Sequence, residues 1–249
     1  MYPILKFGSV QIATFYVVIS LSLSLLILLF SKKIEHLDNQ SGMTAKQGYD
    51  LLILLLFAGF MGGRFFHVFY EEWIYYRSYP AEIFKFWNGG FVYYGGFIFA
   101  FIASWIYCRL QKISLAAWAD FMTVFVSAAY ALGRFGCFFE GCCFGRMTDV
   151  SWAIQGRHPT QIYMIVAEFI LLAAVILSEK KLKPFPGRLF LLWATFHAAT
   201  RFIIEFYRDD GRGQFIAGLS ISQWISLTIV LLASFVFVYK QLPPKKSSN

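Results

Sequence analysis

The chain has 249 residues, of which 58% are hydrophobic and 14% charged, and its formal net charge at pH 7 is +8. A soluble domain usually carries about 25% charged residues, so this composition excludes an ordinary soluble protein and indicates an integral membrane protein. No polar stretch is long enough for a soluble domain, so we predict a single membrane domain over residues 1–249.

Seven apolar segments predict an all-α integral membrane protein with seven transmembrane helices. Each segment is long enough, or nearly so, to cross the hydrocarbon core, which takes roughly 20 residues of helix. A membrane β-barrel would instead show short strands of alternating hydrophobicity. In chain order the segments are 11–30, 50–70, 90–108, 115–135, 160–178, 188–207 and 220–240.

The basic residues predict how these helices are oriented. Cytoplasmic loops carry an excess of Lys and Arg, and here twelve such residues fall in one set of loops and seven in the other. Lys32 and Lys33 belong to the richer set and follow the first segment, which argues against a cleavable signal peptide. We therefore expect an outside N-terminus, a cytoplasmic C-terminus and a disordered cytoplasmic tail over residues 240–249. The positive charge then reflects topology and attraction to anionic lipids, and we expect no nucleic-acid binding.

Two outer connections are rich in aromatic residues and glycine. Residues 71–87 hold several Trp and Tyr, which settle at the membrane–water interface. They form either an ordinary aromatic belt or an arm that takes part in substrate entry. Residues 86–100 contain two glycine pairs, which permit either close helix approach or a backbone turn near a ligand.

The sixth apolar segment carries polar side chains on one helical face. The spacing of His197, Arg201, Glu205 and Arg208 is four, four and three residues, which stacks them on a helix. An arginine in mid-span costs about 2.5–3.5 kcal/mol, so it normally faces a polar cavity or a partner. The stripe predicts a cavity-lining helix. The alternative is an Arg201–Glu205 ion pair that only holds the helices together.

The fourth segment repeats this pattern. Its polar residues follow at three- and four-residue steps and are Ser127, Tyr130, Arg134 and Cys137. Arg134 is therefore expected to face inward, as Arg201 does. Two inward arginines and one glutamate leave a surplus of positive charge that suits a phosphate, which the planar guanidinium grips with two hydrogen bonds. Snorkelling of the arginines toward outer headgroups is the alternative.

Two further clusters are candidates for the same cavity. The stretch "GRHPTQIYM" contains His158, Gln161 and Tyr163, and its Pro159 marks a turn into the fifth segment. Arg64, in "GGRFFHVFY", either completes the set of arginines or marks the end of the second segment.

Three of the four cysteines lie in "GRFGCFFEGCCFG", residues 133–145. The fourth, Cys108, is expected only to pack, because a free cysteine behaves as a small hydrophobe. The C-x4-C-C spacing of Cys137, Cys142 and Cys143 differs from the paired C-x2-C of structural zinc sites. It leaves four possibilities open: a disulfide, a metal site completed by a nearby His or Glu, a thiolate of lowered pKa beside an arginine, and plain packing.

Over nearly its whole length the chain resembles the prolipoprotein diacylglyceryl transferase family. The matching stretches, in order, are "GGRFFHVF", "WNGGFVYYGG", "GRFGCFFEGCCFG", "RHPTQIY" and "RFIIEFYRDDGRGQ". The resemblance implies a seven-span helical body in the bacterial cytoplasmic (inner) membrane, with outer loops forming a small periplasmic head. It implies transfer of the diacylglyceryl group of phosphatidylglycerol to the lipobox cysteine of a prolipoprotein, forming a thioether and releasing glycerol phosphate. No cofactor is expected.

The resemblance also implies which residues form the site. Arg134 and Arg201 take the positions of the family's essential arginines, and Glu205 orients Arg201. The catalytic candidates are Arg134, Arg201, Glu205, Tyr94 and Glu140. The substrate-binding candidates are Arg64, Gly95, Gly96, Gly133, Cys137, Gly145, His158, Gln161, Tyr163 and Arg208.

Several positions depart from the family pattern. Tyr94 stands where the family usually has a histidine, a candidate base for the incoming thiol. A tyrosine of ordinary pKa, about 10, is a poorer base at neutral pH. Cys137 and Glu140 replace asparagines, and Cys142 and Met164 replace glutamates.

These departures indicate a divergent member of the family. We expect a phospholipid-dependent diacylglyceryl transferase. The alternatives are a paralogue that binds phospholipid but modifies another acceptor, and a non-catalytic or redox membrane protein that uses the three motif cysteines. The candidates to replace the missing histidine as general base are Glu140, His67 and His158.

Overall fold

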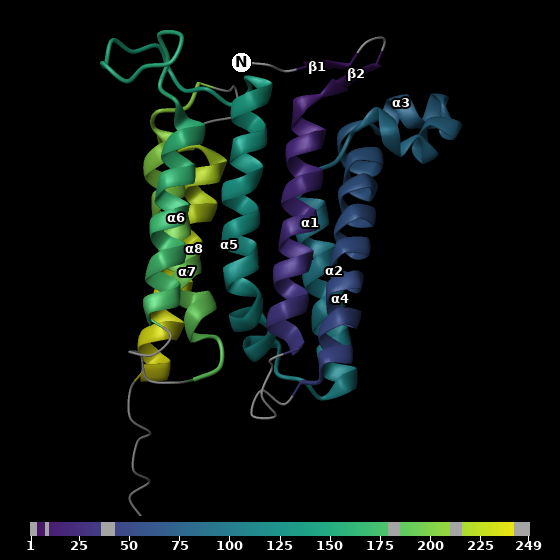
Figure 1. Ribbon diagram of the computed structural model, residues 1–249, viewed down its shortest axis with the longest axis vertical. Coiled ribbons are helices and arrows are strands. Elements are labelled where there is room, and N and C mark those ends of the chain that lie inside the picture. The colour runs from purple at the N-terminus through teal and green to yellow at the C-terminus, as the bar shows by residue number, and fades with distance from the viewer. Residues whose placement is uncertain (1–3, 8–9, 36–42, 179–184, 210–215, 242–249) are drawn as a thin grey trace, which may run out of the picture. The chain divides into compact units, whose positions relative to one another are not determined.

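The computed structural model describes residues 4–7, 10–35, 43–178, 185–209 and 216–241. The predicted tail therefore lies outside the described residues from position 242 onward. Within the described residues the protein is mostly helical (Figure 1). The helices of 18 residues or more are α1 (Thr14–Glu35), α2 (Ala45–Phe66), α4 (Tyr93–Gln111), α5 (Leu115–Glu140), α6 (Thr160–Ser178), α7 (Arg188–Glu205) and α8 (Ile221–Gln241).

Each of the seven predicted spans coincides with one of these long helices. By length and composition, five helices of the described chain are apolar enough to cross a membrane: α1, α2 with the π-helix η2 (His67–Glu71) that continues it, α5, α6 and α8. Of the other two long helices, α7 carries Arg188, Arg201 and Glu205. The membrane character is thus confirmed, while the number of seven spans and their orientation stay predictions.

The all-α prediction was wrong in one respect. Strands β1 (Ile4–Phe7) and β2 (Val10–Ala13) form a two-stranded antiparallel sheet. The first helix consequently begins at Thr14 and not at residue 11. Two of the four residues of β2 are β-branched, which favours extended backbone. A strand this short, next to a long apolar helix, has no periodic signal of its own.

The chain divides into two compact units, residues 1–31 with 119–249, and residues 32–118. In the first unit α5, α6, α7 and α8 run side by side (Figure 1). The carboxyl ends of α5 and α7 and the amino ends of α6 and α8 lie at the same end of this unit. This arrangement brings residues from four helices and two connections together.

Asp120 of α5 fixes the start of α7. Its carboxylate accepts hydrogen bonds from the amides of Gly187 at 2.8 Å and Phe190 at 3.0 Å. A carboxylate in this position satisfies amides that have no partner within the helix, and it interacts favourably with the helix dipole. Leu189 in the same turn belongs to a buried apolar cluster with residues of α6. The first unit therefore holds α7 in a defined position against α5 and α6.

In the second unit the two glycine pairs play different roles. Gly95 faces α2, where a Cβ on Gly95 would lie 2.5 Å from the carbonyl oxygen of Gly62, and a Cβ on Gly96 would also meet α2 backbone. These glycines permit close helix approach. Gly89 and Gly90 have φ values of 78° and 79°, the left-handed region that favours glycine. Close helix approach is thus realised at Gly95 and Gly96. Gly89 and Gly90 form a backbone turn, and a ligand near that turn stays a prediction.

The predicted arm over residues 71–87 consists of short helices with exposed aromatic side chains. These helices are α3 (Trp73–Ser78), η3 (Pro80–Phe84) and η4 (Phe86–Asn88). Trp87 is 75% exposed and Tyr79 60% exposed. Such side chains are typical of a segment at a membrane–water interface.

Candidate functional site

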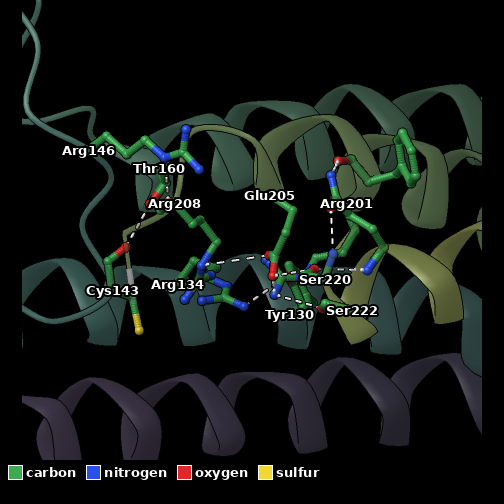
Figure 2. Close-up of polar contacts among 12 residues, drawn as sticks. Tyr130, Arg134, Cys143, Arg146, Thr160, Arg201, Glu205, Arg208, Ser220 and Ser222 are labelled. Carbon is green, nitrogen blue, oxygen red and sulfur yellow. Dashed lines mark hydrogen bonds and ion pairs between the residues drawn. The ribbon is translucent and has the colours of Figure 1, made fainter. Parts of the chain in front are cut away.

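Glu205 is buried at the end of α7 between two arginines. Its Oε2 lies 2.9 Å from Arg201 Nη2 and 3.9 Å from Arg208 Nε. Its Oε1 accepts a hydrogen bond from Ser220 Oγ at 3.1 Å. Arg201 Nη2 also donates to Ser222 Oγ at 3.2 Å. The Arg201–Glu205 ion pair considered from the sequence is therefore present, and serines at the start of α8 hold it in place (Figure 2).

Arg134 of α5 brings a third guanidinium to this region. Its Nη2 donates to Tyr130 Oη at 2.9 Å, and its guanidinium carbon lies 4.9 Å from the centre of the Tyr130 ring. The charges of Arg134, Arg201 and Arg208 lie close enough to repel one another. Figure 2 shows the three side chains around the same carboxylate. Three guanidiniums with one carboxylate leave a net positive charge in largely buried surroundings.

One buried nitrogen of Arg201 is an unused hydrogen-bond donor among the described residues. Within the described residues, its Nη1 has no hydrogen-bond partner. Leaving a buried donor unpaired costs about 1–3 kcal/mol, and more for a charged group. A phosphate or carboxylate satisfies a guanidinium with two parallel hydrogen bonds. The arrangement therefore favours an anionic ligand.

Glu168 of α6 is a buried acid that is not among the residues predicted from the sequence. Its Oε1 accepts hydrogen bonds from Ser127 Oγ at 2.8 Å and Trp193 Nε1 at 2.6 Å. Its Oε2 lies 2.7 Å from His197 Nδ1. The His197 ring in turn packs edge-on against Tyr130, with 4.6 Å between centroids. The available signal was a single charged residue inside an otherwise apolar span, which is a functional indication by itself.

His158 and Tyr163 form a hydrogen-bonded pair at the entry to α6. Their Nδ1 and Oη atoms are 3.0 Å apart, and Trp152 Nε1 donates to the same hydroxyl at 2.8 Å. The His158 ring also packs edge-on against Tyr207, just beyond α7. The structure therefore brings this predicted cluster to the same end of the unit as the arginines. Its role in substrate binding stays a prediction.

Gly145 lies where three segments meet. Its amide donates to the carbonyl oxygen of His158 at 2.8 Å, and it forms an isolated β-bridge with Arg208. A Cβ at this position would lie 2.7 Å from His158 Cβ and 2.9 Å from Thr160 Cγ2. Close packing thus accounts for this glycine. At Gly133, by contrast, a Cβ would meet no atom within 4 Å among the described residues.

The end of α5 reverses the chain and brings the motif cysteines together. The Cys142 amide donates to the Cys137 carbonyl oxygen at 3.1 Å, and the Gly141 amide to that of Phe138 at 3.3 Å. Gly141 has a φ of 81°, as the residue after a helix end does in a Schellman motif. Cys142 and Cys143 fold back toward the last helical turn, where Cys137 lies. The C-x4-C-C spacing therefore corresponds to one such reversal.

Two buried residues of α6 hold the reversed chain. Thr160 Oγ1 donates to the carbonyl oxygen of Cys143 at 2.6 Å, and Gln161 Nε2 donates to that of Cys142. The other amide atom, Gln161 Oε1, is buried and has no hydrogen-bond partner in the described part of the chain. Gln161 therefore positions the cysteines and still offers one acceptor.

The three thiols form a compact group. Their Sγ atoms lie within 4.8 Å of one another, and all three cysteines are free and half-buried. Among the described residues the disulfide considered from the sequence is thus not formed. A hydrogen bond from Cys137 is the main cause that lowers the pKa of Cys143 below its ordinary value, and the charges of Arg208 and Arg134 add to it. Burial raises the pKa of Cys142.

Comparison with known proteins identifies the family. A family model described as prolipoprotein diacylglyceryl transferase matches residues 3–239. The chain belongs to the prolipoprotein diacylglyceryl transferase family. The resemblance inferred from the ordered motifs is thereby confirmed, and with it the expectation of a transferase.

Individual members of the diacylglyceryl transferase family match over most of their length. A phosphatidylglycerol–prolipoprotein diacylglyceryl transferase of Bordetella parapertussis is 30% identical over 216 residues, which cover 83% of this chain and 82% of the relative. Enzymes of the same name from Mannheimia succiniciproducens and Aliarcobacter butzleri are 34% and 35% identical. These matches cover 80% and 72% of this chain and 78% and 71% of the relatives.

Arg64, another candidate from the family motifs, directs its guanidinium to the backbone of its own unit. It is 3% exposed and hydrogen-bonds to main-chain carbonyl oxygens, among them Gly89 at 2.5 Å, Glu82 at 2.7 Å and Ile83 at 3.1 Å. Arg64 therefore holds the segment between α2 and α4. Substrate binding by this residue stays a prediction.

The candidates for a general base occupy different settings. Tyr94 lies in the first turn of α4, and its side chain is outside the described part of the structure. His67 Nδ1 lies 2.9 Å from Glu71 Oε2 in the π-helix. Glu140 is exposed at the last residue of α5. None of these contacts shows which residue is the general base, so that role stays a prediction for each of them.

Proposed function

We propose that this protein transfers the diacylglyceryl group of phosphatidylglycerol to the cysteine thiol of a prolipoprotein. The observation that carries the proposal is the buried Nη1 of Arg201, which has no partner among the described residues while Arg134 and Arg208 add positive charge around it. This charge suits the phosphate of an anionic phospholipid. Family membership and the names of the relatives support the two substrates.

The proposed chemistry assigns the arginines to the leaving group. The acceptor sulfur attacks the glycerol carbon that bears the phosphate, the carbon–oxygen bond breaks, and its electron pair stays on the phosphate oxygen. Negative charge grows on that oxygen, where fixed guanidiniums lower the barrier most effectively. Glu205 keeps Arg201 oriented through the 2.9 Å ion pair.

The remaining site candidates contribute to binding in this proposal. Gln161 Oε1 accepts a hydrogen bond from a hydroxyl of the leaving glycerol. His158 and Tyr163 line the same end of the unit. Gly133 leaves space for an acyl chain one residue before Arg134, because a Cβ there would meet no described atom within 4 Å.

In the membrane we propose seven spans, with the N-terminus outside and the C-terminus in the cytoplasm of a bacterial inner membrane. The helices α4 and α7 then cross the bilayer with the five more apolar helices, and the polar stripe of α7 faces the bundle interior. Large exposed apolar side chains on α1, α6 and α8, such as Leu21, Ile170 and Leu231, support contact with lipid. The aromatic arm over residues 71–87 lies at the outer interface, where the lipid enters sideways between helices.

A second candidate function is a paralogue that binds the same phospholipid but modifies another acceptor. Two features favour this second candidate: Tyr94 stands in place of the family histidine, and three thiols form a cluster. Both differences concern groups that would bind or activate the acceptor, while the arginines stay in place.

The test is a transfer assay with purified, reduced protein, labelled phosphatidylglycerol and a peptide that carries a lipobox cysteine. We expect a thioether-linked diacylglyceryl peptide, and no product with a lipobox peptide in which serine replaces the cysteine. Phosphatidylethanolamine serves as the zwitterionic control lipid. Tight binding of phosphatidylglycerol without any thioether peptide would reject the prolipoprotein reaction and favour the second candidate.

A further inference from the structure

The phosphate site proposed above does not use the cluster of Cys137, Cys142 and Cys143. The Sγ atoms lie within 4.8 Å of one another on one reversed turn. Hydrogen bonds from Thr160 and Gln161 fix the backbone of the two later cysteines. Three converging thiols on a fixed backbone can serve together as ligands of a metal ion.

We propose that these three thiols bind a zinc ion whose fourth coordination position takes the acceptor thiol. This inference rests on the proposed function and names how the acceptor is activated. Zinc sites with a chemical role use three protein ligands and keep the fourth position open. Thiolates are soft ligands that select zinc and copper(I) over magnesium and calcium, and zinc undergoes no redox change during a displacement.

The spacing of the sulfur atoms suits such an ion. A zinc–sulfur bond is about 2.3 Å, so two thiolates on a tetrahedral zinc lie roughly 3.8 Å apart. The sulfurs at up to 4.8 Å would close onto the ion by about 1 Å at most. Because the cysteines are half-buried, the group is not sealed, as an open fourth position requires.

The charges around the cluster also fit. Three thiolates and a divalent ion carry one net negative charge, which the neighbouring Arg134 and Arg208 offset, since both interact electrostatically with Cys143. The same arginines hold the phosphate in the proposed reaction. The metal-bound nucleophile and the leaving group would therefore meet at one place, within the first unit of the chain.

A zinc site would explain why the family histidine is replaced, which the phosphate-binding arginines do not explain. Tyr94 stands at the position of that histidine, which would accept the proton of the incoming thiol. A thiol that coordinates a metal is deprotonated outright, so the acceptor would lose its proton to water on binding zinc. Its sulfur then forms the bond to the glycerol carbon as the carbon–oxygen bond breaks and glycerol phosphate leaves. The neutral thioether product dissociates from the metal.

The experiment uses the full-length protein, purified in detergent under reducing conditions, and needs no turnover. Zinc content is measured by elemental analysis, and cobalt(II) is titrated as a spectroscopic probe of thiolate coordination. A lipobox peptide is then added, with its Cys→Ser version as the control. Cys142→Ser tests the cluster, and Cys108→Ser is the matched control, because Cys108 is also free but belongs to the other unit.

We expect one metal ion per chain, thiolate-to-cobalt absorption, and a spectral change on adding the cysteine peptide but not the serine peptide. Binding should be lost in Cys142→Ser and retained in Cys108→Ser. Failure of the wild-type protein to bind cobalt or zinc stoichiometrically would overturn the inference whatever the variants do. So would equal binding by Cys142→Ser, or a cobalt spectrum that the cysteine peptide leaves unchanged.

The inference and the proposed function fail in different ways. Thioether formation by protein stripped of metal with a chelator would overturn the zinc site and leave the transferase standing. A cobalt site that binds the peptide thiol, with no transfer from phosphatidylglycerol, would support the zinc site and reject the donor in the proposed function.

Discussion

Arg201 and Glu205, one turn apart on α7, are joined at 2.9 Å, yet Arg201 Nη1 stays buried and unpartnered among the described residues. The carboxylate therefore orients this guanidinium without using all of its donors. With Arg134 and Arg208 beside it, one glutamate does not neutralise the region. This positive charge suits an anionic ligand.

Replacing Arg201 by lysine should impair turnover more than folding. Lysine keeps the charge but loses the planar fork that binds two phosphate oxygens. Loss of one such preorganised donor lowers kcat by roughly 10²–10³-fold. The measurement is kcat for thioether formation in Arg201→Lys, with the exposed Arg77→Lys as control. An Arg201→Lys enzyme as active as Arg77→Lys would contradict the phosphate-binding role.

Glu168 should matter for stability. Glu168→Leu leaves the buried hydroxyl of Ser127 and the half-buried donors of Trp193 and His197 without their acceptor, at about 1–3 kcal/mol for a buried group that stays unsatisfied. For a chain of this size each kcal/mol shifts Tm by about 2–4 °C. Thermal unfolding in detergent is the measurement, and Glu168→Gln should recover part of the loss. Glu71→Gln, at an exposed position, is the control. If Glu71→Gln lowered Tm as much as Glu168→Leu does, the stabilising role of Glu168 would be refuted.

Gly145 and Gly133 should respond differently to the same substitution. Gly145→Ala places a Cβ 2.7 Å from His158 Cβ, between backbone segments that cannot yield easily. Overpacking of this kind costs about 1–3 kcal/mol, so Tm should fall. Gly133→Ala meets no described atom within 4 Å, so its Tm should stay close to that of the wild type. Equal Tm values for the two variants would show that close packing does not explain Gly145.

The Cys143 thiol should be alkylated at lower pH than an ordinary thiol. Its pKa is lowered, chiefly by the hydrogen bond from Cys137, so the reactive thiolate is present above this lowered pKa and disappears only as pH falls through it. The pKa of Cys142 is raised, so its thiolate appears only at higher pH. Iodoacetamide labelling of reduced, chelator-treated protein, read by peptide mass spectrometry against pH, separates the two. Labelling of Cys142 at a lower pH than Cys143 would reverse the assignment.

The sequence predicted the helices well because long apolar segments have few alternatives in a membrane. It also placed His197, Arg201 and Glu205 on one face of α7, since a four-residue spacing determines which side chains share a face. Arg208, predicted on the same helix, instead follows its end. The short sheet was missed because four-residue strands depend on pairing with each other, which no local pattern reveals. Glu168 was missed although it is the single charge in its apolar span, and its partners on two other helices could not be read from the sequence.

The chemistry of the cysteines also could not be predicted from the sequence. The spacing of Cys137, Cys142 and Cys143 left several chemistries open, because it does not state where the helix ends. The reversal at Gly141 decides that the three sulfurs converge. At Arg64 a family motif suggested substrate binding, and the structure shows hydrogen bonds to backbone carbonyls, which the motif did not reveal; substrate binding there stays a prediction.

Transfer of the diacylglyceryl group is measured most directly by comparing the two products of one reaction. Reduced wild-type protein is incubated with phosphatidylglycerol and a lipobox peptide, and both glycerol phosphate and diacylglyceryl-thioether peptide are quantified by mass spectrometry. We expect the two products to appear in equal amounts and both to fall together in Arg201→Lys. Thioether formation that proceeds unchanged in Arg201→Lys, or glycerol phosphate released without thioether, would contradict it.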